Sequence, residues 1–280
     1  MNRRRLVALV AAATAALAST TAVSPPAAQA ATTALVVSNT TAIAPPDGFP
    51  PGTNSQLVVA GQTGLVADLD VTLNGFGSTF PDDIDILLRG PNGRSVMLMS
   101  DACVGDDVSN QTIRFDDEAL VPVPETTACL SGSYWPSDGE AADDTGFQTP
   151  NAHSLGVFDG VSPNGTWTLF VADDDDPDTT VIAGGFTLTF QLTDITGPTV
   201  TFGKVPKPSP STTQKVPFSA SDAGSTFECN VDGVGWNPCK SPVKLKHLSV
   251  GKHKLSVRAT DPSRNLGPAA TVKVKVTPKK

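Results

Sequence analysis

Carboxylates are the side chains of this sequence best suited to chemistry, because five of them fall within one short segment. They are Asp173, Asp174, Asp175, Asp176 and Asp178. Negative charges this close repel one another, and a hard cation bound through oxygen ligands would offset the repulsion. The segment is no EF-hand, since counting from Asp174 the sixth position is Thr179 and the twelfth is Gly185, where Gly and Glu are needed. We therefore predict a calcium site, with a solvated acidic loop as the alternative.

Further aspartates lie at the ends of other predicted strands. Asp68, Asp82, Asp83, Asp85 and Asp101 would converge with the acidic segment if those strands adjoin it. Calcium takes about six to eight oxygen ligands from carboxylates, carbonyls and water. We predict that Asp83, Asp85 and Asp101 act as metal ligands together with the five aspartates of segment 173–178.

Nucleophilic catalysis would require a base beside a serine or cysteine. The sequence contains three histidines, His153, His247 and His253. His153 is close in sequence to Ser154 and Asp159, but closeness in sequence does not make a catalytic triad. We interpret these histidines as surface or structural residues and predict no catalytic residue.

Two further groups of residues could bind a ligand. Tyr134 and Trp135 could stack on a sugar ring, or could instead pack their loop onto the fold. Lysines of the C-terminal part could form one face that binds an anionic polymer, or could be scattered and only solvate the surface. These lysines are Lys240, Lys244, Lys246, Lys252, Lys254, Lys273 and Lys275.

The acidic segment lies between two runs in which apolar and polar residues alternate, 167–171 and 186–190. A period of two is typical of strands with one face in a core. Asn164-Gly165, before the first run, is a turn signal because both residues tolerate positive φ. The stretch 162–191 is therefore predicted to be a hairpin whose loop carries the carboxylates.

The same alternation recurs along the chain, without a convincing amphipathic helix. Many short strands separated by Gly, Pro and Asn turns favour an all-β fold, with a jelly-roll sandwich followed by a smaller immunoglobulin-like sandwich. Residues 116–155 show little periodicity and are predicted to form a long loop. The strands are predicted near 35–37, 69–73, 84–88, 96–98, 113–115, 200–202, 216–218, 227–231, 243–245, 255–259 and 272–276.

Charge divides the sequence sharply, although the whole chain carries a net charge of only −8. Residues 31–195 contain 24 acidic residues and three arginines, whereas residues 196–280 contain 14 basic and 4 acidic residues. Such asymmetry indicates two domains. We predict a first domain over 31–195, a linker with the first strand over 196–210, and a second domain over 211–280 that also includes a strand near 199–203.

The N-terminal 30 residues have the pattern of a secretory signal peptide. Three arginines precede an apolar run, and an A-x-A site ends at Ala30. We predict cleavage there, export, and no membrane span. Four cysteines in an exported chain favour two disulfides. Three pairings exist, and we favour the neighbours in sequence, Cys103 with Cys129 and Cys229 with Cys239.

Three stretches of the first domain, 82–101, 163–173 and 184–190, share a pattern with a known family. Their best-matching motifs are D-I-x-L-x-G-P-x-G and G-T-W-x-L-x-V-x-D. Together they resemble the proprotein convertase P domain, also called P/Homo B, over roughly residues 35–193. The resemblance implies a jelly-roll sandwich that carries calcium and stabilises the catalytic domain of a subtilisin-like serine protease.

The catalytic half of such a protease has no counterpart in this sequence. It contains no Asp-Ser-Gly, His-Gly-Thr or Gly-Thr-Ser-x-Ala block, so it is similar to the bacterial subgroup found in secreted proteins without a protease. The second domain carries F-x-C-x-x-D-G-x-x-W-x-x-C from Phe227 to Cys239 and resembles bacterial immunoglobulin-like modules. Such modules usually serve as spacers or adhesive units.

These observations predict a secreted, non-catalytic, calcium-binding P-domain protein that acts in extracellular binding or structural support. Two alternatives stay open: an accessory or trans-acting partner of a subtilisin-like serine endopeptidase, and a carbohydrate-binding module. The expected partner is an extracellular protein or a cell-envelope polymer rather than nucleic acid.

Overall fold

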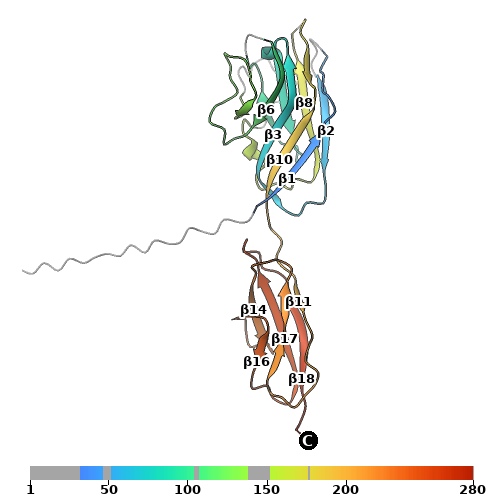
Figure 1. The fold of residues 1–280 in the computed structure, drawn as a ribbon, viewed down its shortest axis with the longest axis vertical. Helices are drawn as coiled ribbons and strands as arrows, with labels where there is room; N and C mark the ends of the chain where they lie inside the picture. Colours follow the sequence, from blue (N-terminus) through green and yellow to red (C-terminus); the bar gives the residue numbers. More distant parts are fainter. Residues whose placement is uncertain (1–31, 47–51, 104–106, 138–151, 176, 280) are drawn as a thin grey trace, which may run out of the picture.

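The computed structural model describes residues 32–46, 52–103, 107–137, 152–175 and 177–279 (Figure 1). The predicted signal peptide and its cleavage site lie outside the described residues. Within them the chain forms eighteen strands and two short 3₁₀ helices, η1 (Pro81–Asp83) and η2 (Leu155–Phe158). The predicted all-β fold class is confirmed.

The first part of the chain folds into two sheets, seen in blue to yellow in Figure 1. One has the order β1-β10-β3-β6-β7, with β9 also paired to β3, and the other has the order β2-β8-β4-β5. The strands of the first sheet are β1 (Thr32–Asn39), β3 (Leu65–Ser78), β6 (Val108–Phe115), β7 (Gly132–Tyr134), β9 (Thr180–Ile182) and β10 (Phe186–Thr193). Those of the second are β2 (Thr53–Val59), β4 (Ile84–Arg89), β5 (Ser95–Met99) and β8 (Gly165–Asp173).

The strands on either side of the acidic segment belong to different sheets, so the predicted hairpin is wrong. β8 pairs with β2 and β4, whereas β10 pairs with β1 and β3. The alternation itself is confirmed, because both strands bury every second residue against the same core. Alternation reports which face of a strand is buried, but it does not identify the strand's neighbours.

Trp167 links the two sheets at the centre of the core. Its ring is fully buried and meets Phe190 of the opposite sheet edge-to-face, with 5.3 Å between ring centroids. Phe158 of η2 approaches from the other side at 4.9 Å, and the indole N–H donates to the carbonyl of Pro163. A Cβ at Gly90 would lie only 2.6 Å from the Phe158 ring. The glycine of the D-I-x-L-x-G-P-x-G motif is therefore required for this aromatic packing.

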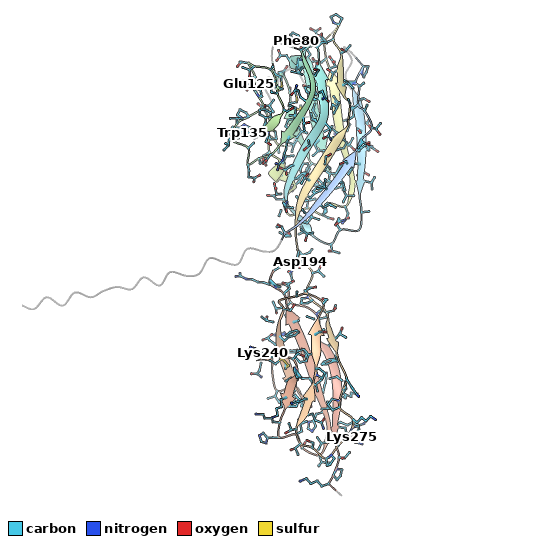
Figure 2. All side chains as sticks on the ribbon, in the orientation of Figure 1. Phe80, Glu125, Trp135, Asp194, Lys240 and Lys275 are labelled. Carbon is cyan, nitrogen blue, oxygen red and sulfur yellow. A yellow bond between two sulfur atoms is a disulfide. The ribbon has the colours of Figure 1, made fainter. Side chains whose placement is uncertain are left out.

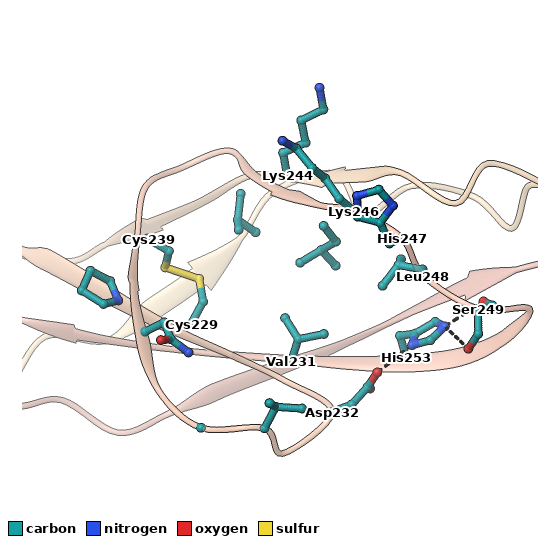
Figure 3. Close-up of a pocket in the computed structure, with 16 residues that line it drawn as sticks. Cys229, Val231, Asp232, Cys239, Lys244, Lys246, His247, Leu248, Ser249 and His253 are labelled. Carbon is teal, nitrogen blue, oxygen red and sulfur yellow. Dashed lines mark hydrogen bonds and ion pairs between the residues drawn. A yellow bond between two sulfur atoms is a disulfide. The ribbon is translucent and has the colours of Figure 1, made fainter.

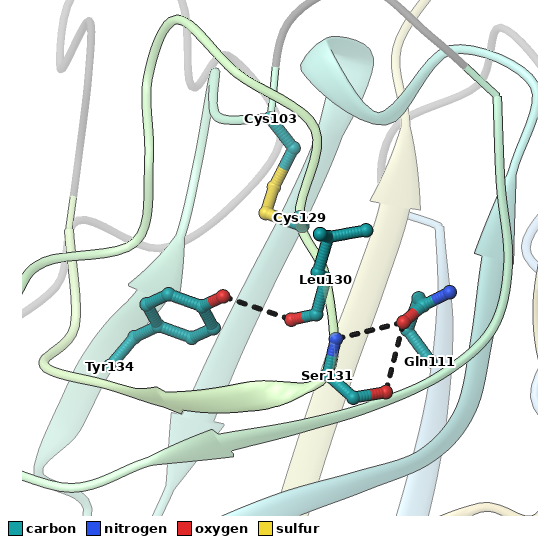
Figure 4. Close-up of a disulfide and its surroundings, with 6 residues drawn as sticks. All are labelled: Cys103, Gln111, Cys129, Leu130, Ser131 and Tyr134. Carbon is teal, nitrogen blue, oxygen red and sulfur yellow. Dashed lines mark hydrogen bonds between the residues drawn. A yellow bond between two sulfur atoms is a disulfide. The ribbon is translucent and has the colours of Figure 1, made fainter.

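Several elements were not predicted from the sequence. No strand was predicted at β2, and the predicted loop 116–155 contains η2 and β7, which pairs in parallel with β6. The disulfide between Cys103 and Cys129 anchors this region, as Figure 4 shows. Tyr134 of β7 donates a hydrogen bond to the carbonyl of Leu130 beside that disulfide.

The second part of the chain builds its own core from three small sheets. The sheet β15-β14-β17-β18 and the pairs β12-β16 and β11-β13 pack around the residues of this core. Pro217 separates β12 from β13, where one strand was predicted, because proline lacks the backbone N–H that a ladder needs. The strands are β11 (Val200–Phe202), β12 (Gln214–Val216), β13 (Phe218–Ala220), β14 (Thr226–Val231), β15 (Asn237–Cys239), β16 (Val243–Leu245), β17 (Gly251–Thr260) and β18 (Ala270–Val276).

The second disulfide joins Cys229 of β14 to Cys239 of β15, so both favoured pairings are present. Each disulfide belongs to one of two separate hydrophobic clusters: the first is drawn from residues between Ile43 and Leu192, the second from residues between Val216 and Val276. The predicted domain bounds stay a prediction, with the change between the two clusters falling after Leu192.

We expect Trp167→Ala to lower the free energy of unfolding by about 3–5 kcal/mol, because it leaves a large cavity between the sheets. Trp135, which is 42% exposed, provides the matched control, and Trp135→Ala should cost less than about 1 kcal/mol. Urea denaturation followed by far-ultraviolet circular dichroism measures both. Equal losses in the two variants would show that Trp167 does not hold the sheets together.

Candidate functional site

Carboxylates from η1 and from the segment after β8 gather at one end of the first sandwich. The backbone N–H of Asp174 donates to the carbonyl of Asp83 at 3.1 Å, which holds the two segments side by side. Burial, and then the charges of Asp175, Asp174 and Asp178, raise the pKa of Asp83 to about 7, with a smaller effect of Asp82. The fold thus brings Asp83 together with three of the predicted loop ligands.

Thr79 fixes part of this acidic end. Its hydroxyl donates to Asp178 Oδ1 at 3.1 Å and accepts from the backbone N–H of Thr179 at 2.9 Å. The backbone N–H of Thr79 donates to the carbonyl of Thr179 at 3.1 Å. The segment after β8 is therefore tied to the end of β3, and Asp178 is held near the other carboxylates.

Asp173 and Asp85 are the buried members of the predicted ligand set, with 0% and 6% of their surface exposed. In the ladder between β4 and β8, Asp173 lies opposite Ile84 and Asp85 lies opposite Ala172. Because successive side chains point to opposite faces of a sheet, Asp85 and Asp173 lie on different faces. The two carboxylates therefore do not form one ligand pair within the sheet.

The remaining predicted ligands have different outcomes. Asp101 follows β5, and the pairing of Ile86 with Met99 places it toward the same end of β4 as Asp83. Asp68 does not join the cluster: it lies ten residues before Ser78 along β3, a separation of about 33 Å. Asp176 lies outside the described residues.

The acidic end offers carboxylate and hydroxyl oxygens, which is the donor chemistry that calcium prefers. Within the described ranges, however, no group of three or more His, Cys, Asp or Glu side chains is placed to hold a metal ion. The residues thus fit calcium by chemistry, and an ion would have to draw their oxygens closer together.

A second group of charges is balanced internally. Arg114 Nη2 lies 2.7 Å from Asp70 Oδ2 and 3.2 Å from Asp116 Oδ2. Burial raises the pKa of Asp70, although its hydrogen bond and charge interaction with Arg114 act in the opposite direction. Burial also raises the pKa of nearby Asp68, with the charge of Asp116 adding to it. This group is accounted for as a structural ion pair on the outer face of β3 and β6.

His153, considered for catalysis in the sequence, is followed by Ser154, whose hydroxyl has a structural role. The Ser154 hydroxyl donates to Asp117 Oδ2 at 2.6 Å and accepts from the N–H of Gly156. Asp117 also accepts from the backbone N–H groups of Leu155 and Gly156. Ser154 therefore caps η2 and fastens it to Asp117.

A Ser-His-Asp arrangement that sequence reasoning missed occurs in the second core, at the edge of a groove of about 620 Å³ (Figure 3). His253 Nδ1 lies 2.6 Å from Asp232 Oδ2, and Nε2 lies 2.9 Å from the carbonyl of Ser249 but 3.5 Å from its hydroxyl. Carboxylate and carbonyl oxygens only accept, so the ring satisfies both contacts as an imidazolium. In this state both ring nitrogens donate, and the two bonds tie β17 to Asp232 and to the Ser249 carbonyl.

The lysines predicted to form one face lie on two. Lys244 is outward-facing on β16 and Lys254 on β17, while Leu245 and Leu255 of the same strands share the core between the sheets. Their outward residues consequently point away from each other, and Figure 3 shows Lys244 and Lys246 directed away from His253. Of the two alternatives, the one in which all these lysines share a single face does not hold, because β16 and β17 belong to different sheets.

The two aromatic residues considered for sugar binding differ in their surroundings. Tyr134 packs against the first core and donates to the Leu130 carbonyl, so it anchors its segment. Trp135, labelled in Figure 2, is 42% exposed. Of the pair, only Trp135 presents a substantial surface to solvent.

Comparison with known proteins gives partial likenesses only. No protein-family model matches the chain, and no curated protein matches it. The serine protease of Aeromonas sobria, in complex with its chaperone, is 16% identical over 58% of this chain, with a TM-score of 0.32, and the chain covers 26% of that protease's length. Fibronectin(III)-like modules of Clostridium thermocellum CbhA are 23% identical over 29% of this chain and 100% of theirs, with a TM-score of 0.23. At these TM-scores the likenesses carry no argument about activity.

In the described part of the chain, none of the helices has the length and apolar character that crossing a membrane requires.

The His253–Asp232 pair makes the stability of the second core depend on pH. Hydrogen bonds to Asp232 and to the Ser249 carbonyl raise the pKa of His253, and the bond to His253 lowers the pKa of Asp232. The imidazolium therefore stabilises the fold fully below the ordinary histidine pKa of about 6.5. That contribution is lost as the pH rises through the raised value.

Hydrogen exchange of the β17 amides should accordingly become faster as the pH rises from about 6 to about 8, beyond the intrinsic pH effect on exchange. His253→Gln should abolish this extra dependence, whereas the exposed His247→Gln should leave it intact. If the extra pH dependence of exchange persists unchanged in His253→Gln, another titrating group causes it.

Proposed function

We propose that this chain is an exported, non-catalytic protein whose first sandwich binds calcium and which acts in extracellular binding or structural support. The observation that carries the proposal is the convergence of Asp83 with Asp174, Asp175 and Asp178, whose charges add to the effect of burial and raise the pKa of Asp83 to about 7. Either protonation or a cation must offset the repulsion among these carboxylates. A divalent cation does so while leaving all of them ionised.

Calcium would be held by Asp83 of η1 and by Asp174, Asp175 and Asp178 after β8, with Asp173 and Asp101 next in reach. When bound, it would supply positive charge and join the two segments. Because η1 leads into β4 and the acidic segment leaves β8, the ion would fasten the end of the sheet that contains both strands. Its role in this proposal is to stabilise the domain.

Export is supported by the signal-peptide pattern of the sequence and by the disulfides. Both cysteine pairs are bonded, and no cysteine of the described residues is free. Disulfides are typical of proteins that mature in oxidising compartments.

Membership of the P-domain family is part of the proposal, supported by what its motifs do in this fold. Gly90 of the first motif makes room for Phe158 and Trp167, and Trp167 belongs to the second motif. The same motifs contain Asp85 and Asp173, the two buried carboxylates. If this membership holds, a second candidate function is that of an accessory partner for a subtilisin-like protease. A carbohydrate-binding role of the first sandwich is supported only by the exposed ring of Trp135.

Calcium at about 100 times its Kd should stabilise the first sandwich by about 2.7 kcal/mol. The measurement is thermal unfolding of chelator-treated protein with and without millimolar calcium, together with titration calorimetry. Asp83→Asn should weaken or abolish the calcium-dependent stabilisation. The matched control is Glu125→Gln, which removes an exposed acid from another part of this domain (Figure 2). Absence of both heat and a shift in Tm in the unaltered protein would refute calcium binding.

The purified chain should release no product from casein or from chromogenic peptides above a buffer control. Its proposed lack of catalysis rests on the missing protease blocks and on the hydrogen bonds that occupy Ser154 and His253. Cleavage that a serine-directed inhibitor abolishes would contradict the proposal.

A further inference from the structure

The outer face of the sheet β15-β14-β17-β18 carries lysines in directly opposed pairs. Across the ladder between β17 and β18, Lys252 lies opposite Lys275 and Lys254 lies opposite Lys273. All four are exposed, and they alternate with residues that face the core, such as Leu255. The four ammonium groups thus form a compact array on one face of the second core.

This arrangement is unfavourable in the protein alone. Residues directly opposite each other in an antiparallel pair have Cβ atoms about 4.5–5.5 Å apart, and like charges there destabilise the sheet. The acids at the edge of this face are already engaged: Asp232 contacts His253 at 2.6 Å, and Glu228 contacts Arg258 at 2.8 Å. An external anion would offset the repulsion among the four lysines.

A row of uncharged polar side chains lies next to the lysines. Asn230 on β14, Ser256 on β17 and Thr271 on β18 are aligned across three strands. The hydroxyls of Ser256 and Thr271 lie 3.0 Å apart and can each donate or accept. Amide and hydroxyl groups of this kind pair readily with the hydroxyl groups of a sugar.

The row and Lys254 line a shallow hollow of about 640 Å³, which Asp232 also lines, and the other three lysines lie beside it on the same face. Trp236 forms one border of it, and the Arg258 guanidinium fixes the indole by lying 4.4 Å from its ring centroid. Arg258 is held in turn by its bonds to Glu228. The hollow therefore combines a fixed aromatic border, neutral hydrogen-bonding groups and Lys254, while the carboxylate of Asp232 at its edge is engaged by His253.

We propose that this face binds an anionic polysaccharide. The carboxylate or phosphate groups of the polymer would pair with Lys252, Lys254, Lys273 and Lys275, and its hydroxyl groups would bond to Asn230, Ser256 and Thr271. The lysine charges favour a polyanion over a neutral polymer. The uncharged side chains of Asn230, Ser256 and Thr271 favour a polysaccharide over other polyanions. This site uses no residue of the acidic first sandwich and does not depend on calcium there.

The test uses the full disulfide-bonded chain and polygalacturonate as the probe, in buffer with a chelator so that calcium cannot bridge the polymer to the acidic sandwich. We expect binding at low salt that weakens as salt rises, and no binding to the neutral polymer dextran. Lys254→Gln/Lys273→Gln should weaken binding by about tenfold or more, because it removes two charge-assisted contacts.

The second core offers a matched control. Lys215 and Lys244 also lie directly opposite each other, but on the β12-β16 pair, whose outer face points away from the proposed site. Lys215→Gln/Lys244→Gln makes the same change in net charge and should alter affinity by less than about twofold. Both double variants relieve a like-charge pair, so neither should lower the Tm, and a loss of binding cannot be attributed to unfolding.

Four results would overturn the proposal. Equal weakening by the two double variants would mean that net charge, rather than this face, attracts the polymer. Dextran binding as tight as polygalacturonate binding would show that the lysine charges do not contribute to affinity. If a single-stranded oligonucleotide binds as tightly as polygalacturonate, the face binds polyanions in general and does not select sugars. Unchanged polygalacturonate affinity of Ser256→Val/Thr271→Val would lead to the same conclusion.

Discussion

The packing of Trp167 between two sheets is the interaction on which the first part of the molecule depends. Its ring meets Phe190 of one sheet while its own strand, β8, belongs to the other, and η2 adds Phe158 to the contact. Gly90 and the Pro163 carbonyl complete the surroundings of the indole. The same strand ends in Asp173, so the contact that unites the sheets also fixes where the acidic segment begins.

The two parts of the chain handle charge in opposite ways. In the first, carboxylates from separate segments meet at one end of the sandwich, and burial together with their repulsion raises the pKa of Asp83. In the second, lysines repel across a β ladder on one outer face. Arg114 with Asp70 and His253 with Asp232 show that this chain also builds balanced pairs. The unbalanced groups are therefore the natural places to look for external ions or polymers.

Disulfides and capping interactions hold in place the regions whose sequence shows little periodicity. Cys103–Cys129 and the bonds from Asp117 to η2 hold segments that have few strand contacts of their own. In the second core, Cys229–Cys239 joins the short strand β15 to β14. Small sandwiches with short strands bury little apolar surface per strand, so such links contribute a large share of their order.

The sequence by itself determined the all-β class and the faces of strands such as β8 and β10, because alternation is a local signal. It favoured the observed disulfide pairing among three possible ones. It also singled out the acidic segment. Only the tertiary structure decided that β8 and β10 belong to different sheets and that Asp68 lies far from Asp83. The same holds for the lysines, which lie on two faces, and for the contact between His253 and Asp232. Each of these depends on which strands become neighbours, and pairing between distant strands is fixed by the packing of the whole core, which no local pattern encodes.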